Sequence, residues 1–97
     1  MEYSLSISEA AELDIRDAFL WYEDQKDNLG LTFEKHISKT IQNIQKNPLK
    51  IQIRYNQTRV AFLKKFPYGV HFNIIENEII IVAIFHTSRS PQKWSKR

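Results

Sequence analysis

The chain has 97 residues, of which 42% are hydrophobic, and it contains only two glycines and three prolines. This composition excludes a disordered chain and fits a single small domain over residues 1–97. The absence of cysteine excludes a disulfide framework and a thiolate zinc site, while the net charge of +3 is compatible with an acidic partner. The start lacks a secretion pattern and no apolar run could span a bilayer, so we expect a cytoplasmic protein without membrane contact.

The first 25 residues predict a strand followed by a helix. Tyr3, Leu5 and Ile7 alternate with serines, which is the period of a strand with one buried face. Ser8 is placed to cap a helix that runs to about Gln25, since acidic residues fill the first turn and apolar residues recur at spacings of three and four.

A second amphipathic helix is predicted from Leu29 to the Asn47-Pro48 pair, where proline removes a donor and disfavours helix in the residue before it. Asn28 or Gly30 permits the tight turn between the two helices. We therefore expect an antiparallel helical hairpin.

The remainder of the chain predicts β-structure. Residues 49–57 indicate a loop or a weak edge strand, and residues 58–66, 68–75 and 79–86 indicate strands, the last two joined by a hairpin turn at 76–78. The expected fold is α+β in the order β-α-α-β-β-β, with the helical hairpin on one face of a mostly antiparallel four-stranded sheet.

The last strand is apolar on both sides, which raises the question of what covers the face without helices. Strict alternation places Ile79, Ile81, Ala83 and Phe85 on one side, with Ile80, Val82 and Ile84 on the other. The second side must be covered by the C-terminal tail and the 49–57 segment, or by a partner.

Charge is sorted along the chain. Residues 1–48 hold five Lys/Arg against nine acids, a net −4, whereas residues 49–97 hold nine Lys/Arg against two acids, a net +7. Ordinary solubility charge would explain the total, but the segregation favours a contiguous basic docking surface over the sheet. The predicted binding residues are Arg59, Lys64, Lys65, His71, His86, Arg89 and Lys93.

Several blocks of the sequence resemble the RelE/ParE superfamily of toxins from bacterial type II toxin–antitoxin systems, most closely its ParE-like branch. These are "AELDIRDAFLWYEDQ", "NLGLTFEKHI", "NP", "RVAFLKKFPYGVHF" and "VAIFHTSRSPQKW", in that order over about nine-tenths of the chain. The "KKFPYGVHF" and "FHTSRSPQKW" blocks are the specific ones. Their structural motif residues are Phe66, Pro67, Tyr68, Pro91 and Trp94.

The resemblance implies a growth-inhibiting toxin of a plasmid-stabilisation module, neutralised by a cognate antitoxin in a toxin–antitoxin hetero-oligomer. A homo-oligomer is an open alternative. ParE-like members inhibit DNA gyrase, whereas RelE-like members enter the ribosome and cleave mRNA. A third interpretation is a homologue that retains only antitoxin binding.

If the chain cleaves RNA, the candidate catalytic residues are Arg59, His86 and Arg89, because the reaction needs proton transfer and cations around the phosphate. Arg59 and Lys65, six apart on one predicted strand, would share a face. Ordinary structural roles are the alternative to catalysis. In that case Lys64 and Lys65 are solvated, His86 is hydrogen-bonded within the fold, and His71 is exposed.

The terminal aromatic residue, Trp94, cannot exchange a proton, and the only acids of the β region, Glu76 and Glu78, lie in a turn. Tyr68 and Trp94 are expected to pack on the domain, although stacking on a base is the alternative. The three histidines lack ligand spacing, so no metal and no cofactor is expected. The residues therefore favour a binding toxin over an enzyme.

Overall fold

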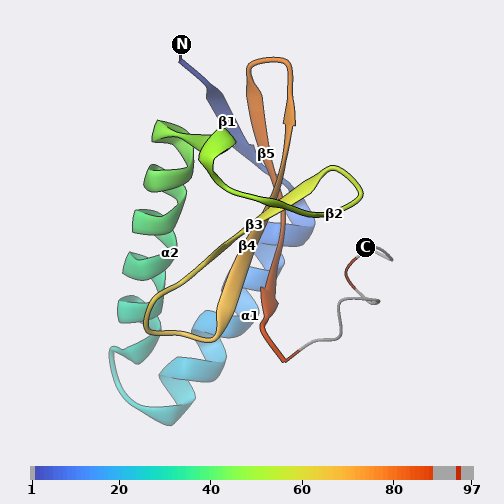
Figure 1. Cartoon of the computed structure of the whole chain (residues 1–97). Coiled ribbons are helices and arrows are strands. Elements are labelled where there is room, and N and C mark those ends of the chain that lie inside the picture. The colour runs from blue at the N-terminus through green and yellow to red at the C-terminus, as the bar shows by residue number, and fades with distance from the viewer. Residues whose placement is uncertain (1, 89–93, 95–97) are drawn as a thin grey trace.

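The computed structural model describes residues 2–88 and 94. Two antiparallel helices cover one face of a mixed sheet (Figure 1). The predicted α+β fold and its element order are confirmed. The elements are β1 (Ser4–Ile7), α1 (Glu9–Gln25), α2 (Leu29–Lys46), the 3-10 turn η1 (Pro48–Lys50), β2 (Ile53–Tyr55), β3 (Thr58–Phe62), β4 (Tyr68–Ile75) and β5 (Glu78–His86).

The start of α1 is set by local chemistry that the sequence displays. Ser8 is extended, with φ −67° and ψ 157°, and its Oγ accepts a hydrogen bond from the Ala11 N–H at 3.1 Å. This bond satisfies one of the N–H groups that a helix start leaves unpaired. The predicted cap and the predicted end at Gln25 are both confirmed.

The connection between α1 and α2 is tight because Asn28 adopts φ 69° and Gly30 lies against α1. A Cβ on Gly30 would stand 2.6 Å from the Phe19 carbonyl oxygen, which leaves no room for a larger residue. The Glu23 carboxylate accepts hydrogen bonds from the N–H groups of Gly30 at 2.8 Å and Leu31 at 3.3 Å. A carboxylate from α1 thus caps the start of α2, where the helix dipole favours negative charge.

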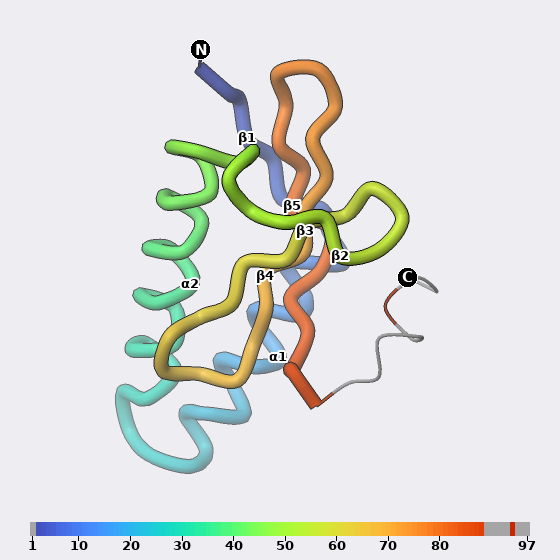
Figure 2. Tube along the Cα trace, in the orientation of Figure 1, coloured from blue at the N-terminus to red at the C-terminus, as the bar shows by residue number. Residues whose placement is uncertain are grey.

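The sheet has five strands in the order β1-β5-β4-β3-β2, so the expected count of four is wrong by one. The additional strand is β2, within the segment for which the sequence indicates a loop or a weak edge strand. All pairs are antiparallel except β1 with β5, which Figure 2 traces side by side although they lie at opposite ends of the chain.

Strand β3 ends at Phe62, four residues before the predicted end. The chain turns there because the Leu63 N–H donates to the Tyr68 carbonyl at 3.0 Å, which closes the connection to β4. Lys65 therefore lies in this connection and not on a strand with Arg59, and the expectation that these two residues share a strand face is wrong.

A bulge changes which residues of β5 face the helices. Phe72 pairs with Ile81 but His71 pairs with Ala83, so the register shifts between them. Ile84 consequently joins the helix-side core with Ile81, and the face expected from strict alternation is wrong beyond Val82. A bulge adds one residue to one strand, so the side chains beyond it point to the face opposite the one that strict alternation predicts.

The core between the helices and the sheet is apolar and aromatic. Phe33 and Phe72 are fully buried there, and Tyr22 packs on Phe33 and Phe66 with ring centroids 5.3 and 5.0 Å apart. Burial of each such ring contributes about 1.5–3 kcal/mol. This core holds the sheet against the hairpin and positions the surfaces described below.

Candidate functional site

The face of the sheet opposite the helices carries an aromatic cluster around His71. The imidazole is 1% exposed, and its Nδ1 lies 2.9 Å from the Tyr55 hydroxyl. Phe85 and Trp94 pack against the ring with centroids 4.9 and 4.8 Å away. The expectation that His71 is exposed is therefore wrong, because β2 and the C-terminal segment bring Tyr55 and Trp94 over it.

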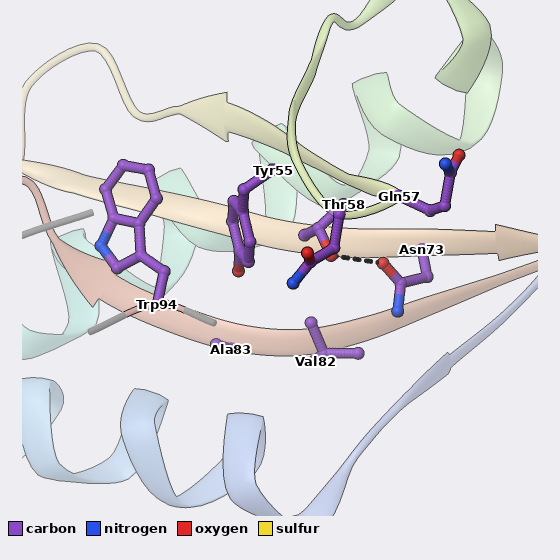
Figure 3. A pocket seen from close by; sticks show the side chains of 8 residues that line it. Tyr55, Gln57, Thr58, Asn73, Val82, Ala83 and Trp94 are labelled. Carbon is purple, nitrogen blue, oxygen red and sulfur yellow. Dashed lines mark hydrogen bonds between the residues drawn. The ribbon is translucent and has the colours of Figure 1, made fainter. Parts of the chain in front are cut away.

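Beside this cluster lies an open cavity of about 370 Å³. Figure 3 shows Trp94 and Tyr55 next to each other at one end, and the Thr58 hydroxyl donating to the Asn73 side-chain oxygen at 2.7 Å near the other. The Trp94 indole N–H is buried without a hydrogen-bond partner among residues 2–88 and 94. The described lining contains no ionisable group other than the Tyr55 phenol: Tyr55, Asn56, Gln57, Thr58, Asn73, Val82, Ala83 and Trp94.

Arg59 is half-buried and is occupied by the protein backbone. Its Nη1 donates to the carbonyl oxygens of Leu49, at 3.3 Å, and Ile51. The guanidinium thereby fastens η1 and the following residues to β3. A group that binds backbone carbonyls in this way serves the fold, and its loss would leave the part-buried Ile51 carbonyl without this partner.

Lys64 and Lys65 line a groove between α2 and β3 that we call the α2/β3 groove. Its volume is about 370 Å³, and α2 contributes two further basic side chains, His36 and Lys39. No acidic residue of the described chain lines this groove. Its described lining is His36, Lys39, Thr40, Asn43, Ile44, Ile51, Ala61, Phe62, Lys64 and Lys65.

His86 lines a different cavity, which we call the α1/β5 groove, with a volume of about 260 Å³. Two carboxylates, Asp14 and Asp17, line it together with Trp21 and Tyr68, and no lysine or arginine among residues 2–88 does so. The Asp14 carboxylate accepts a hydrogen bond from the Ile84 N–H at 2.9 Å, where β5 extends beyond β1. The groove is therefore acidic, unlike the one between α2 and β3.

The His86 ring is oriented by Ser88. Its Nδ1 lies 3.0 Å from the Ser88 N–H and 2.7 Å from the Ser88 hydroxyl. A backbone N–H can only donate, so Nδ1 accepts and the neutral ring carries its proton on Nε2. In this tautomer the Nδ1 lone pair faces Ser88 and Nε2 carries the proton.

The described candidates for catalysis do not converge. Arg59 pairs with Phe72 on β4, whereas His86 lies opposite Tyr68, four residues farther along that strand. At a rise of about 3.3 Å per residue, the two positions are about 13 Å apart along the sheet. Proton transfer and phosphate stabilisation at one atom need groups within hydrogen-bond reach, which this pair does not provide.

The contiguous basic docking surface expected over the sheet stays a prediction, because four of its nine Lys/Arg lie outside the described residues. His71 is buried, Lys64 and Lys65 line the α2/β3 groove, and His86 lies beside carboxylates. The predicted residues Arg89, Pro91 and Lys93 lie outside the described residues. The charge count over the two halves of the sequence does not identify Lys39 as part of a basic surface. Lys39 lies in the acidic half, but in the structure it lines the same groove as Lys64 and Lys65.

The motif residues Phe66, Pro67 and Tyr68 form the entry to β4. The Phe66 ring is buried and contacts His36 at a centroid distance of 5.3 Å, and the Pro67 carbonyl accepts from the Thr87 N–H at 2.8 Å. Tyr68 contacts Tyr22 and the His86 ring. Burial, followed by the neighbouring Tyr68 phenol, raises the pKa of Tyr22 above its usual value of 10.0.

Among residues 2–88 and 94, no group of three or more His, Asp or Glu side chains is arranged to hold a metal ion. Neither α1 nor α2 is long and apolar enough to cross a membrane.

Comparisons with known proteins are consistent with this architecture. The family model described as "ParE toxin of type II toxin-antitoxin system, parDE" matches residues 5–91. The chain is similar to a solved structure of a chromosomal ParDE toxin–antitoxin system from P. aeruginosa, with 19% identity and a TM-score of 0.81 over 90% of this chain and 98% of that chain.

A second similar structure is the toxin–antitoxin complex RelBE2 from Mycobacterium tuberculosis, with 11% identity and a TM-score of 0.59 over 89% of this chain and 99% of that chain. No curated protein sequence matches the chain. At these identities the two structures establish a shared fold.

Proposed function

The chain belongs to the ParE toxin family of type II toxin–antitoxin systems, and from this premise we propose that it inhibits growth by binding a DNA-handling enzyme, DNA gyrase, without chemistry of its own. The proposal concerns the target and the mode of action. It includes neutralisation in the cytoplasm by a cognate antitoxin in a hetero-oligomer, as expected for a plasmid-stabilisation module.

The observation that supports binding over cleavage is the placement of the two described catalytic candidates. Arg59 is engaged by backbone carbonyls, and the Nδ1 of His86 is occupied by Ser88. The two residues lie about 13 Å apart along the sheet, and the carboxylates near His86 carry the charge that repels a scissile phosphate. A ribosome-dependent endoribonuclease is the alternative that the experiment below tests.

The experiment expresses the chain without an antitoxin and compares it with His86→Ala. This substitution removes an exposed ring and leaves the core intact. We expect both proteins to arrest growth equally, within about twofold, and to raise the DNA-damage response while messages stay intact. Ribosome-associated message cleavage that His86→Ala abolishes would contradict the proposal.

Arg59 requires a second design because it holds backbone carbonyls. Arg59→Lys keeps one donor and the charge, whereas Arg59→Ala leaves the Leu49 and Ile51 carbonyls without this partner. We expect any loss of growth inhibition in Arg59→Ala to follow its loss of folded protein, measured by thermal unfolding. A fully folded Arg59 variant that loses all inhibition would favour a direct role.

A further inference from the structure

The His71 ring is enclosed by side chains that are distant from it in the sequence. Its Nδ1 lies 2.9 Å from the Tyr55 hydroxyl of β2, and the Trp94 indole packs against it with centroids 4.8 Å apart and an interplanar angle of 78°. Tyr55 and Trp94 also contact each other, with centroids 5.5 Å apart (Figure 3). These two side chains, which we call the Tyr55–Trp94 cover, lie against an imidazole that is 1% exposed.

Apolar side chains of the sheet are buried on the same face as His71. Val60 and Ala83 stand opposite His71 on the neighbouring strands, so their side chains share its face. Phe85 contacts the His71 ring with centroids 4.9 Å apart. Val60, Ala83 and Phe85 are at most 3% exposed, yet they do not belong to the core between the helices and the sheet. Movement of the cover would therefore expose apolar surface while the helix-side core stays closed.

A proton on His71 would place a charge where little stabilises it. Strands β3 and β5 present apolar side chains to the ring, and the ionisable group in contact with it among the described residues is the Tyr55 phenol. Arg59, the neighbouring cation on β3, stands opposite Phe72 and so belongs to the helix side of the sheet. Residues 87–97 contain no Asp or Glu, so any charged side chain in that stretch is positive.

The aromatic rings around His71 do not remove this cost. Their faces attract a cation, but the attraction replaces only part of the hydration that an imidazolium loses in a buried site. Exposure to water supplies the missing hydration. A protonated His71 therefore favours an arrangement in which the Tyr55–Trp94 cover has moved away.

The cover is attached to the sheet through its weakest strand. β2 is an edge strand of three residues, and it pairs with β3 only through Ile53 with Arg59 and Tyr55 with Thr58, with a shift of register between the two pairs. His71 itself adjoins the bulge of the β4–β5 pair. Short and interrupted ladders open at lower free energy than continuous ones. The Tyr55 end of β2 can thus move while β4 and β5 stay paired.

We propose that His71 is a pH-sensitive switch: the neutral ring holds the Tyr55–Trp94 cover closed, and protonation opens the cover and exposes the apolar surface of Ala83 and Phe85. An exposed imidazole takes up a proton near pH 6.5, and the closed arrangement binds that proton less tightly because it buries the ring. The closed arrangement is therefore favoured above about pH 6.5 and is lost as the pH falls below this value. The inference does not depend on the cellular target.

Fluorescence of Trp94 tests the switch. The chain has two tryptophans, so Trp21→Phe leaves Trp94 as the only one. We expect its emission to shift to longer wavelength, and its quenching by acrylamide to rise about threefold, as the pH of the full-length protein falls from about 8 to about 5. The far-UV circular dichroism of the two helices should stay unchanged over this range, because the helix-side core remains closed.

Variants assign the transition to one histidine. The chain has three histidines, so His36→Gln combined with His86→Gln leaves His71 as the only one, and this double variant should keep the shift. His71→Gln retains a polar side chain that does not titrate and should give the same emission at both ends of the pH range. In the wild type, the ring protons of His71, followed by NMR, should titrate with the same midpoint as the Trp94 emission.

The inference is overturned if the Trp94 emission does not change with pH, if the change persists in His71→Gln, or if the double variant lacks it. A His71 ring that titrates with a different midpoint from the Trp94 emission also overturns it. So does a loss of helical circular dichroism in step with the emission, because the event is then acid unfolding of the whole domain. None of these measurements involves gyrase or an antitoxin, so the switch and the proposed function can fail separately.

Discussion

The two grooves beside the helical hairpin have opposite charge, although each lies between one of the helices and the sheet side of the molecule. Among the described residues, the α2/β3 groove is lined by Lys39, Lys64 and Lys65 without an acid, and the α1/β5 groove by Asp14 and Asp17 without a lysine or arginine. The difference comes from Asp14 and Asp17 of α1 in one groove, and from Lys39 of α2 with Lys64 and Lys65 of the β3–β4 connection in the other. It shows that charge is organised by the fold and not by position along the chain.

The largest expected effect is a loss of stability when His71 is replaced. It tests whether the two grooves depend on the same sheet. His71→Ala removes a buried ring from the far face of the sheet and leaves the Tyr55 hydroxyl without that partner. We expect it to lower the free energy of unfolding by about 2–4 kcal/mol, by analogy with large-to-small core changes. Chemical denaturation measures this loss.

Tyr55→Phe is the matched control, because it keeps the ring and removes only the hydroxyl. It should cost about 1 kcal/mol. If His71→Ala and the exposed His86→Ala destabilise the chain equally, the aromatic cluster does not support the sheet as described.

A smaller effect is expected within the α1/β5 groove. Asp14→Ala removes the acceptor of the Ile84 N–H, and we expect a loss of about 1–2 kcal/mol from the unpaired donor. Asp17→Ala makes the same change of charge on an exposed side chain of the same groove and should cost less than about 0.5 kcal/mol. Equal losses, measured by thermal unfolding, would assign the effect to charge alone.

The smallest effect concerns Tyr22, which lies in the core between the grooves. Because its folded pKa is raised above the unfolded value of 10.0, the folded state binds the proton more tightly. The contribution of the protonated Tyr22 phenol to the free energy of unfolding is therefore complete below pH 10, and it is lost as the pH rises through the folded pKa. Unfolding curves at about pH 9 to 11 should show a steeper alkaline loss in the wild type than in Tyr22→Phe, and identical slopes would contradict this.

The helix side of the molecule could be predicted from the sequence because its signals are local. The Ser8 cap, the helical periodicities and the Asn47-Pro48 stop each act within a few residues, and all three are observed. The helical hairpin and all four expected strands follow in the correct order, and β3 is shorter than expected.

The other face could not be predicted because it depends on contacts between distant segments. His71 alternates with apolar residues as an exposed side chain would, yet Tyr55 and Trp94 pack against its ring. The bulge near Val82 leaves no clear mark in an all-apolar strand, yet it decides the faces of Ile84 and Phe85. Contacts between distant segments also explain why the sequence does not identify Lys39 as a neighbour of Lys64 and Lys65, which follow β3.

The central claim is that this chain acts by binding and not by cleavage. The most direct measurement adds the purified chain, over a concentration series, to a DNA gyrase supercoiling reaction and in parallel to a translating ribosome mixture. We expect supercoiling to fall with rising concentration, equally for wild type and His86→Ala, while the message stays intact. Cleaved message with unaffected supercoiling would contradict the claim.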